Sequence, residues 1–144
     1  MKTFTRILAV IFLAAATLIS CSDKLVPADQ LPAAAHSFIQ QYFPGIPISY
    51  VKKDAGLKTG FEVVLTDGTE IDFDGKGEWD SVDCRRSAVP EALVPAAIAG
   101  YVQTSFPGQM IVKIDKELYG YEIELGSGLD LKFDNNGKLI RIDD

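Results

Sequence analysis

Two segments of the chain repeat one spacing of apolar residues, at intervals of three and four positions. The first segment extends from Leu31 to Phe43 and the second from Val94 to Phe106. This spacing predicts two amphipathic helices, each with one buried face. Each segment has a Pro at its second position and a Pro-Gly pair directly after its last apolar residue. Such positions of Pro and Gly are typical of the first turn and the end of a helix.

Each predicted helix is followed by four short runs of residues that favour strands. Apolar and polar positions alternate most clearly over residues 61–65 and 121–125. A period of two predicts strands with one buried face, and the short gaps between the runs predict an antiparallel meander. The expected strands are 47–53, 60–66, 70–74 and 78–83, followed by 110–116, 119–125, 129–134 and 138–143.

The two halves are copies of one unit. Residues 31–34 match residues 94–97 at an offset of 63, and the offset falls to 60 after the first strand of each copy. This duplication predicts an α+β fold of two tandem repeats, each a helix packed on a four-stranded antiparallel meander sheet. The first repeat is expected over residues 26–86 and the second over residues 89–144. Matched segments include Leu31-Pro32-Ala33-Ala34 with Val94-Pro95-Ala96-Ala97, Phe43-Pro44-Gly45 with Phe106-Pro107-Gly108, and Phe61-Glu62-Val63 with Tyr121-Glu122-Ile123.

The first 20 residues have the pattern of an export signal. Lys2 and Arg6 precede an apolar run, Ile7–Ile19, that is shorter than the roughly 20 residues a membrane-spanning helix needs. The run ends in Leu18-Ile19-Ser20-Cys21, which resembles the lipobox of bacterial lipoproteins.

The lipobox resemblance implies that a signal peptide over residues 1–20 is removed and that Cys21 carries a lipid anchor. Residues 21–30 are then expected to form a short tether. Ser22, rather than Asp, follows the cysteine, and the sorting rule of enteric bacteria then implies the outer membrane. The alternative is an ordinary secreted protein that is cut nearby, with an incidental Cys21.

Motifs in both repeats also resemble the PepSY-like putative beta-lactamase-inhibitor-like family, whose members are small exported proteins common in Bacteroidetes. The resemblance implies the tandem helix-plus-sheet architecture of beta-lactamase inhibitory protein, and it supplies no catalytic residues. It rests on Leu31-Pro32-Ala33-Ala34, Phe43-Pro44-Gly45, Phe61-Glu62-Val63, Asp67-Gly68-Thr69-Glu70, Phe73 and Gly77-Glu78-Trp79.

One face of each sheet should remain open, because a single helix covers only the other face. A three-residue loop, Asp67-Gly68-Thr69, would keep residues 61, 63, 65, 71 and 73 on the covered face. Ile140 and Ile142 are expected in the core, so Leu139 and its counterpart Trp79 should point outward, as should Tyr50. Exposed Trp and Tyr are frequent anchors for protein partners. Tyr50 and Trp79 are therefore candidate binding residues, although a bulge would turn Trp79 into the core.

Acidic side chains are expected to gather on the same open face. Glu62 should lie opposite Asp74 and Glu122 opposite Asp134, and like charges across a sheet repel. A bound calcium ion would relieve this repulsion, and neutralisation by neighbouring basic residues is the simpler account, so no metal site is assigned. The candidate acidic binding residues are Glu62, Asp72, Glu122 and Glu124, and the neutralising residues are Lys52, Lys113 and Arg141.

Charge and composition narrow the possible functions. The chain has 144 residues and a net charge of -6. Removal of residues 1–20 takes away two basic residues and no acidic ones, which leaves 12 basic against 20 acidic residues, or -8. This charge argues against a nucleic-acid partner.

Candidate catalytic residues are few. One His and two Cys offer little for a metal cluster. A pair of Cys84 and His36 is conceivable, but no nucleophile motif surrounds Cys84. Cys84 is expected to be a free, partly buried thiol, and the alternative is an intermolecular disulfide. No catalytic residue and no cofactor is therefore assigned.

The sequence favours a lipid-anchored, non-enzymatic binding module of the cell envelope. Its open sheet faces are expected to bind a protein or peptide, and its anchor to contact the membrane. One alternative is an envelope sensor or accessory protein for a small ligand or calcium. A hydrolase inhibitor is a further alternative, suggested by the fold resemblance alone.

Overall fold

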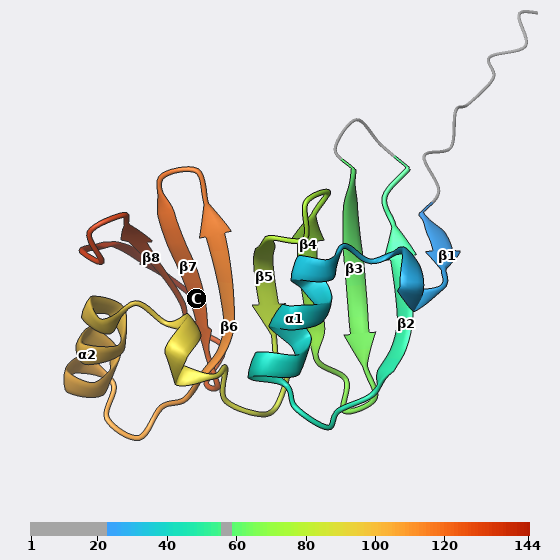
Figure 1. Cartoon of the computed structure of the whole chain (residues 1–144). Coiled ribbons are helices and arrows are strands. Elements are labelled where there is room, and N and C mark those ends of the chain that lie inside the picture. The colour runs from blue at the N-terminus through green and yellow to red at the C-terminus, as the bar shows by residue number, and fades with distance from the viewer. Residues whose placement is uncertain (1–22, 56–58) are drawn as a thin grey trace, which may run out of the picture.

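The computed structural model describes residues 23–55 and 59–144 (Figure 1). In these residues, nine strands form one antiparallel sheet in chain order, β1 to β9, and two α-helices pack on it. The signal peptide and lipid attachment expected for residues 1–20 and Cys21 lie outside the described residues. In the part of the chain that is described, no helix combines the length and apolar character needed to span a membrane.

The second half of the chain repeats the order of elements in the first half. In each, a 3-10 helix precedes an α-helix, and four strands follow. The elements are β1 (Lys24–Val26), η1 (Ala28–Gln30), α1 (Ala33–Tyr42), β2 (Ile48–Lys53), β3 (Gly60–Leu65), β4 (Glu70–Asp74), β5 (Trp79–Asp83), η2 (Glu91–Leu93), α2 (Ala96–Ser105), β6 (Ile111–Glu117), β7 (Gly120–Leu125), β8 (Asp130–Asp134) and β9 (Leu139–Asp143).

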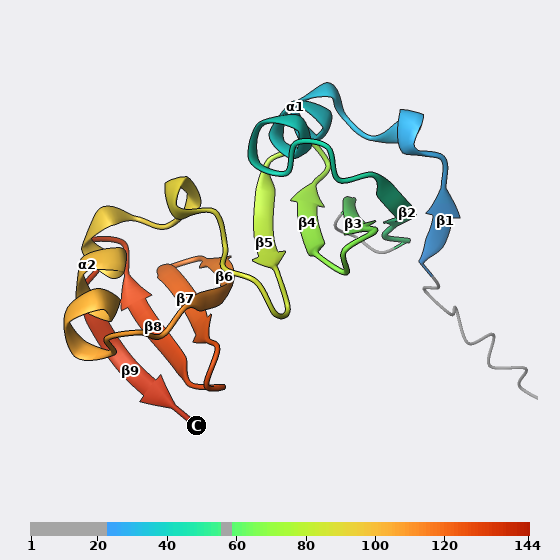
Figure 2. The ribbon, with the colours of Figure 1, turned by 90° about the horizontal axis from the view of Figure 1, so that it is seen from below.

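The strands of both halves belong to one sheet rather than to the two separate sheets expected from the sequence. β5 pairs with β6 antiparallel, with Val82 opposite Ile114 and Asp83 opposite Lys113. This pairing removes two exposed strand edges, which would otherwise carry unpaired backbone groups. Figure 2 shows the strands following one another from β1 to β9 without a break in their order.

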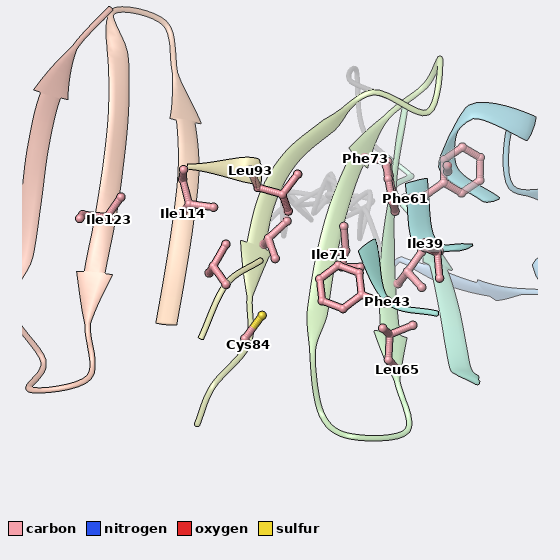
Figure 3. Close-up of a cluster of buried hydrophobic side chains, with 14 of the residues drawn as sticks. Ile39, Phe43, Phe61, Leu65, Ile71, Phe73, Cys84, Leu93, Ile114 and Ile123 are labelled. Carbon is pink, nitrogen blue, oxygen red and sulfur yellow. The ribbon is translucent and has the colours of Figure 1, made fainter. Parts of the chain in front are cut away.

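A row of apolar side chains crosses the sheet on one face. Residues that are directly opposite in neighbouring strands lie on the same face, so a chain of such pairs defines a face through the whole sheet. Every central member of this row is at most 1% exposed. The row runs through Val51, Val63, Ile71, Val82, Ile114, Ile123 and Leu131, and several of its members appear in Figure 3.

Both helices cover this apolar face. The Phe38 ring of α1 meets the Phe73 ring of β4 edge-on at 5.5 Å between centroids. Tyr101 of α2 meets Phe133 of β8 in the same way at 5.6 Å. Phe73 and Phe133 lie two residues after Ile71 and Leu131 on their strands and therefore point to the same side. The opposite face carries no helix within the described residues and is called the open face below.

The segment expected to be a tether over residues 21–30 is largely structured. Lys24–Val26 form β1, which pairs with β2 so that Val26 lies opposite Val51. The next residues form η1, and Nε2 of His36 in α1 lies 2.9 Å from the Ala28 carbonyl oxygen. Val26 extends the apolar row to the edge of the sheet. The contact of this apolar side chain with the row explains why the segment pairs with β2 instead of forming a tether.

Candidate functional site

The hairpins of the sheet place the acidic side chains of the open face differently from the sequence expectation. The β3–β4 loop has three residues, as expected, but it starts one position earlier, since Leu65 N–H donates to the Thr69 carbonyl at 2.8 Å. Gly68, at a φ of +91°, completes this turn. Glu62 consequently lies opposite Asp72 rather than Asp74. The equivalent shift places Glu122 opposite Lys132 rather than Asp134.

Basic side chains neutralise part of the open face. Lys52 Nζ lies 2.7 Å from Glu62 Oε1 across β2 and β3, and Lys132 Nζ lies 2.8 Å from Glu122 Oε2 across β7 and β8. Between them, Lys113 Nζ lies 2.9 Å from Asp115 Oδ2 within β6. Arg85 also pairs with Glu70 and Asp83, and Arg141 pairs with Asp143. The acids without such an ion pair among the described residues are the ones best able to attract a positively charged ligand.

Five acids, of which only Glu62 has an ion-pair partner among the described residues, line a hollow at the start of β3 and the end of β4. This acidic hollow has a volume of about 690 Å³. A Cβ at Gly60 would lie 2.8 Å from an Asp54 carboxylate oxygen, so the glycine allows that side chain to approach the sheet. The acidic residues that line the hollow are Asp54, Glu62, Asp72, Asp74 and Asp80.

Asp72 is the central acid of this hollow. Desolvation, together with the negative charges of Glu62 and Asp54, raises the pKa of Asp72 to about 6. Within the described residues, no basic side chain forms an ion pair with it. Asp72 therefore carries an electrostatic cost at neutral pH that a bound cation would relieve.

Asp74 stabilises a turn at the rim of the acidic hollow. Its Oδ1 accepts the backbone N–H of Lys76 at 2.8 Å and of Glu78 at 2.9 Å, which closes the β4–β5 turn. These hydrogen bonds lower the pKa of Asp74. Asp134 accepts the corresponding bonds in the β8–β9 turn. Asp74 thus adds a fixed negative charge to the hollow.

The second half has a hollow at the equivalent place with different chemistry. This apolar hollow has a volume of about 350 Å³. Leu118 and Tyr119 form the β6–β7 turn and are 81% and 76% exposed, and Ile140 is 63% exposed. Two-residue hairpin turns favour Asn and Gly, so a Leu-Tyr pair here departs from the local preference. The lining residues are Glu117, Leu118, Tyr119, Gly120, Tyr121, Lys132, Phe133 and Ile140.

Both hollows lie at the same end of the sheet. In a meander, every second turn is at the same end, and the β4–β5, β6–β7 and β8–β9 turns fulfil this condition. The β6–β7 hairpin and the β4–β5 turn accordingly rise at the same side in Figure 1. Both hollows are therefore accessible from one end of the sheet.

Tyr50 lies on the open face and Trp79 does not. Tyr50 is 37% exposed, with Lys52 Nζ 5.3 Å from its ring centroid. Trp79 lies opposite Phe73 because a bulge at Asp80 shifts the register of β5. Its half-buried ring packs 6.1 Å from the Phe38 ring, with Lys116 Nζ at 3.9 Å. The expectation that Trp79 points outward is therefore wrong.

The same bulge recurs in β9 and reverses two further expectations. Phe133 lies opposite Leu139, and Ile140 is the extra residue. Leu139 consequently packs against the core, whereas Ile140, expected to be buried, is exposed. Ile142 points to the covered face but remains 44% exposed, because β9 is the last strand.

Of the acids expected to bind, two lie in a hollow and two do not. Glu62 and Asp72 line the acidic hollow. Glu122 is paired with Lys132, and Glu124 lies between Lys113 and Asp130 on the neighbouring strands. Leu118 and Tyr119 were not recognised as candidates, although two large apolar residues in a hairpin turn are a signal of exposure.

Cys84 and His36 have structural roles and do not form a catalytic pair. Burial raises the pKa of the Cys84 thiol to about 11, which keeps it protonated and unreactive. His36 instead joins α1 to η1. Among residues 23–55 and 59–144, no three His, Cys, Asp or Glu side chains converge in a way that could hold a metal ion.

The fold and its motifs match a known family. The profile of a family described as "Putative beta-lactamase-inhibitor-like, PepSY-like" matches residues 58–141. The chain belongs to this family. No curated protein matches the chain significantly.

Three solved structures similar to this PepSY-like chain come from two Bacteroides species. A putative calcium-regulated periplasmic protein from Bacteroides thetaiotaomicron is 38% identical, with a TM-score of 0.81 over 85% of this chain and 97% of that chain. A putative periplasmic protein from Bacteroides vulgatus is 36% identical, with a TM-score of 0.81 over 87% and 99% of the two chains. A second one from Bacteroides vulgatus is 34% identical, with a TM-score of 0.82 over 85% and 100%.

Asp72→Asn tests the electrostatic cost of the acidic hollow. Because the pKa of Asp72 is higher in the folded than in the unfolded chain, the contribution of Asp72 to the free energy of unfolding falls as pH rises from about 4 to about 6. At pH 7 the variant is expected to be more stable than the wild type by about 1 kcal/mol, after allowance for solvent screening. At pH 4 the two should unfold alike in urea. The exposed Glu78→Gln is the control, and a loss of stability at pH 7 in Asp72→Asn would contradict the expectation.

Proposed function

We propose that the protein is a lipid-anchored, non-enzymatic binding module of the bacterial cell envelope, and that its open face holds a protein or peptide. The observation that carries this proposal is the pair of hollows at one end of the sheet, one acidic and one apolar. The periplasmic description of the similar Bacteroides proteins supports an envelope location. The family name describes an inhibitor-like protein rather than an enzyme, in agreement with a binding role.

The acidic hollow suits a Lys or Arg side chain of a partner. Its carboxylates can accept charge-assisted hydrogen bonds, which are stronger than bonds between neutral groups. Ionisation of Asp72 is costly in the free protein, so a cation that binds there recovers interaction energy. The mature charge of -8, derived from 12 basic and 20 acidic residues, also steers basic partners toward the molecule.

The apolar hollow suits a large apolar side chain of the same partner. Leu118 and Tyr119 are exposed at the tip of a hairpin, so a partner that covers them removes apolar surface from water. Aromatic residues at the centre of an interface often contribute most of its binding energy. We therefore assign the anchoring role to Tyr119, with Tyr50 as a second aromatic contact on the open face.

Attachment to the membrane is the second part of the proposal. It is supported by the Leu18-Ile19-Ser20-Cys21 motif and by the apolar run before it. Two or more acyl chains give stable membrane attachment, whereas one chain does not. The anchor would hold the open face near the outer membrane, where its partner must be accessible.

A Cys21→Ser variant tests this attachment. Expressed in a Bacteroides host, the wild type is expected in the detergent phase after phase partitioning, and the variant in the aqueous phase because it lacks the acylated thiol. The control is Cys84→Ser, which should partition like the wild type. Recovery of Cys21→Ser in the detergent phase would sink the lipid-anchor hypothesis.

Loss of each hollow in turn tests partner binding. Leu118→Ser/Tyr119→Ser removes the apolar contact, and Asp54→Asn/Asp80→Asn removes two acids that are exposed and outside the core. Capture of the native partner from crosslinked envelopes, quantified by mass spectrometry, is expected to fall at least about tenfold with either variant.

Two comparisons make the capture experiment decisive. Leu25→Ser changes an equally exposed apolar residue at the far edge and should capture as much as the wild type. Added salt should weaken capture by the wild type more than by Asp54→Asn/Asp80→Asn. If both variants capture as much partner as the wild type, the end of the sheet that carries the two hollows is not the binding site.

Calcium is a second candidate ligand for the acidic hollow. The observations that favour it are the five acids around one hollow and the calcium-regulated description of the similar Bacteroides thetaiotaomicron protein. The described acids do not converge closely enough to chelate an ion as they stand. Calcium binding would therefore require them to move together. The hydrolase-inhibitor alternative is supported by the family name alone.

Thermal unfolding distinguishes calcium from a basic partner. If calcium binds the hollow, millimolar calcium should raise the melting temperature of the wild type and not that of Asp72→Asn, whereas magnesium should have less effect because it favours fewer protein oxygens. An unchanged melting temperature of the wild type would remove calcium as a ligand.

A further inference from the structure

The outer edge of β9 is built like an edge that another strand covers. β9 pairs with β8 on one side, and no strand of the described residues pairs with its other side. Ile142 is 44% exposed there, whereas its counterpart Val82 in β5 is 0% exposed. The difference arises because β6 covers the edge of β5. An unprotected edge with exposed apolar residues is a template for strand pairing.

β5 and β9 sit in identical registers on the strands that precede them. Val82 lies opposite Ile71 and Ile142 opposite Leu131, while Asp83 and Asp143 lie opposite Glu70 and Asp130. β9 therefore presents to its free side the same pattern that β5 presents to β6. On β6, this pattern is met by Ile114 opposite Val82 and by Lys113 opposite Asp83. A strand that fits β9 should accordingly have a basic residue directly before an apolar one.

The backbone of β9 is also oriented for such pairing. Cys84 N–H donates to the Val112 carbonyl at 2.8 Å across the β5–β6 junction. Backbone groups of alternate residues point to the same neighbour, so those of Val82 also face β6. The matching registers place the N–H and C=O groups of Ile142 toward the free side of β9.

β9 itself carries the sequence that fits its own edge. Arg141-Ile142-Asp143 combines the basic residue before the apolar one with the acid after it. When two copies meet antiparallel with Ile142 opposite Ile142, each Arg141 lies opposite Asp143 of the other copy. Both residues are on the open face, where Arg141 Nε already lies 2.7 Å from Asp143 Oδ2 within the strand.

We propose that two copies of this chain associate through their β9 edges as a symmetric dimer with one continuous sheet. The apolar row that ends at Ile142 then continues into the second copy. Association buries the exposed part of Ile142 and pairs the free backbone groups of both strands. Charge complementarity sets the register, because a shift that puts Arg141 opposite Arg141 is repulsive.

The other edge of the sheet does not offer an equivalent contact. β1 has three residues, one of them Lys24, and Pro27 follows it. Short strands, Lys and Pro are the usual features that protect an edge from pairing. A contact of β9 with β1 would also be head-to-tail and would not close, whereas a contact of β9 with β9 closes as a twofold dimer.

The helices leave room for this dimer. α2 packs over β8 through Tyr101 and Phe133. β8 and its counterpart in the second copy would lie three strand spacings apart, or roughly 14 Å. Packed helices need about 8–10 Å between their axes. The two α2 helices can therefore lie side by side without displacing either sheet.

Charge reversal and rescue test the dimer in solution. The soluble chain from Ser22 to Asp144, which contains every described element, is measured by sedimentation velocity from about 1 µM to about 1 mM. The wild type is expected to shift from monomer to dimer with concentration. Arg141→Asp should remain monomeric, and Arg141→Asp/Asp143→Arg should dimerise again because opposite charges are restored. Arg86→Asp, an exposed change away from β9, should behave like the wild type.

Each result decides the proposal. A wild type that is monomeric throughout, or a dimer that Arg141→Asp leaves intact, overturns it. Failure of the double variant to dimerise, with a circular dichroism spectrum and melting temperature like those of the wild type, overturns the symmetric register. Leu118→Ser/Tyr119→Ser should dimerise normally, which separates this contact from partner binding at the hollows.

A symmetric disulfide gives an independent test. Residues directly opposite in a hydrogen-bonded antiparallel pair have Cα atoms about 5.5 Å apart, which a disulfide can span. Ile142→Cys is expected to form a covalent dimer under mild oxidation, whereas Leu25→Cys on β1 should not. Cys84 is buried and protonated, so it does not compete. Crosslinking by Leu25→Cys instead of Ile142→Cys would show that β1 forms the contact and would overturn the proposal.

Discussion

The pairing of β5 with β6 is the contact on which the arrangement of the whole molecule depends. It places Val82 opposite Ile114 and thereby joins the apolar rows of the two halves on one face. A slip of one residue would turn every side chain of the second half to the other face. α2 would then cover the side opposite to α1. The opposite charges of Asp83 and Lys113, which face each other across the strands, and the 2.5 Å hydrogen bond from the Ser81 hydroxyl to Asp115 favour this register on the open face.

Because the two halves belong to one sheet with one covered face, the side chains that differ between their equivalent hollows complement one another. The backbone repeats the same bulge in β5 and β9 and the same glycine at the start of β3 and β7, whereas the connection of residues 54–59 is reduced to Leu118 and Tyr119 in the second half. The side chains that line the equivalent hollows have diverged, so that Asp80 in the first half corresponds to Ile140 in the second, and Asp72 to Lys132. A single repeat could offer one kind of surface only. The two halves together offer charge and apolar area at one end of the sheet, and the shorter β6–β7 turn contributes Leu118 and Tyr119 to the apolar hollow.

Periodicity alone predicted the helices, the strands and their antiparallel order, because each depends on local patterns that burial enforces. The faces of β5 and β9 were harder to predict. Strict alternation puts Ile140 inside and Trp79 outside, but one extra residue in each strand reverses both, and nothing in Asp80 or Ile140 marks a bulge. The loop between β3 and β4 has the expected length, yet its start one position earlier changes the partner of Glu62. A candidate site built from cross-strand neighbours is therefore less predictable than the fold, since an error of one position replaces the expected Glu122–Asp134 contact with the Lys132–Glu122 pair.

The repeated order of elements also determines which edges of the sheet can pair with another strand. β1 stands to β2 as β5 stands to β6, since Val26 lies opposite Val51 in the way that Val82 lies opposite Ile114. The N-terminal segment thus caps the first repeat with a short strand that carries Lys24. β9 keeps the edge pattern with which its counterpart β5 pairs with β6. The residues that pack β9 on β8 also give this pattern to its other edge. An edge of this kind follows from the repeat itself, and Arg141 and Asp143 give it a charge pattern that selects its own copy over a less complementary strand.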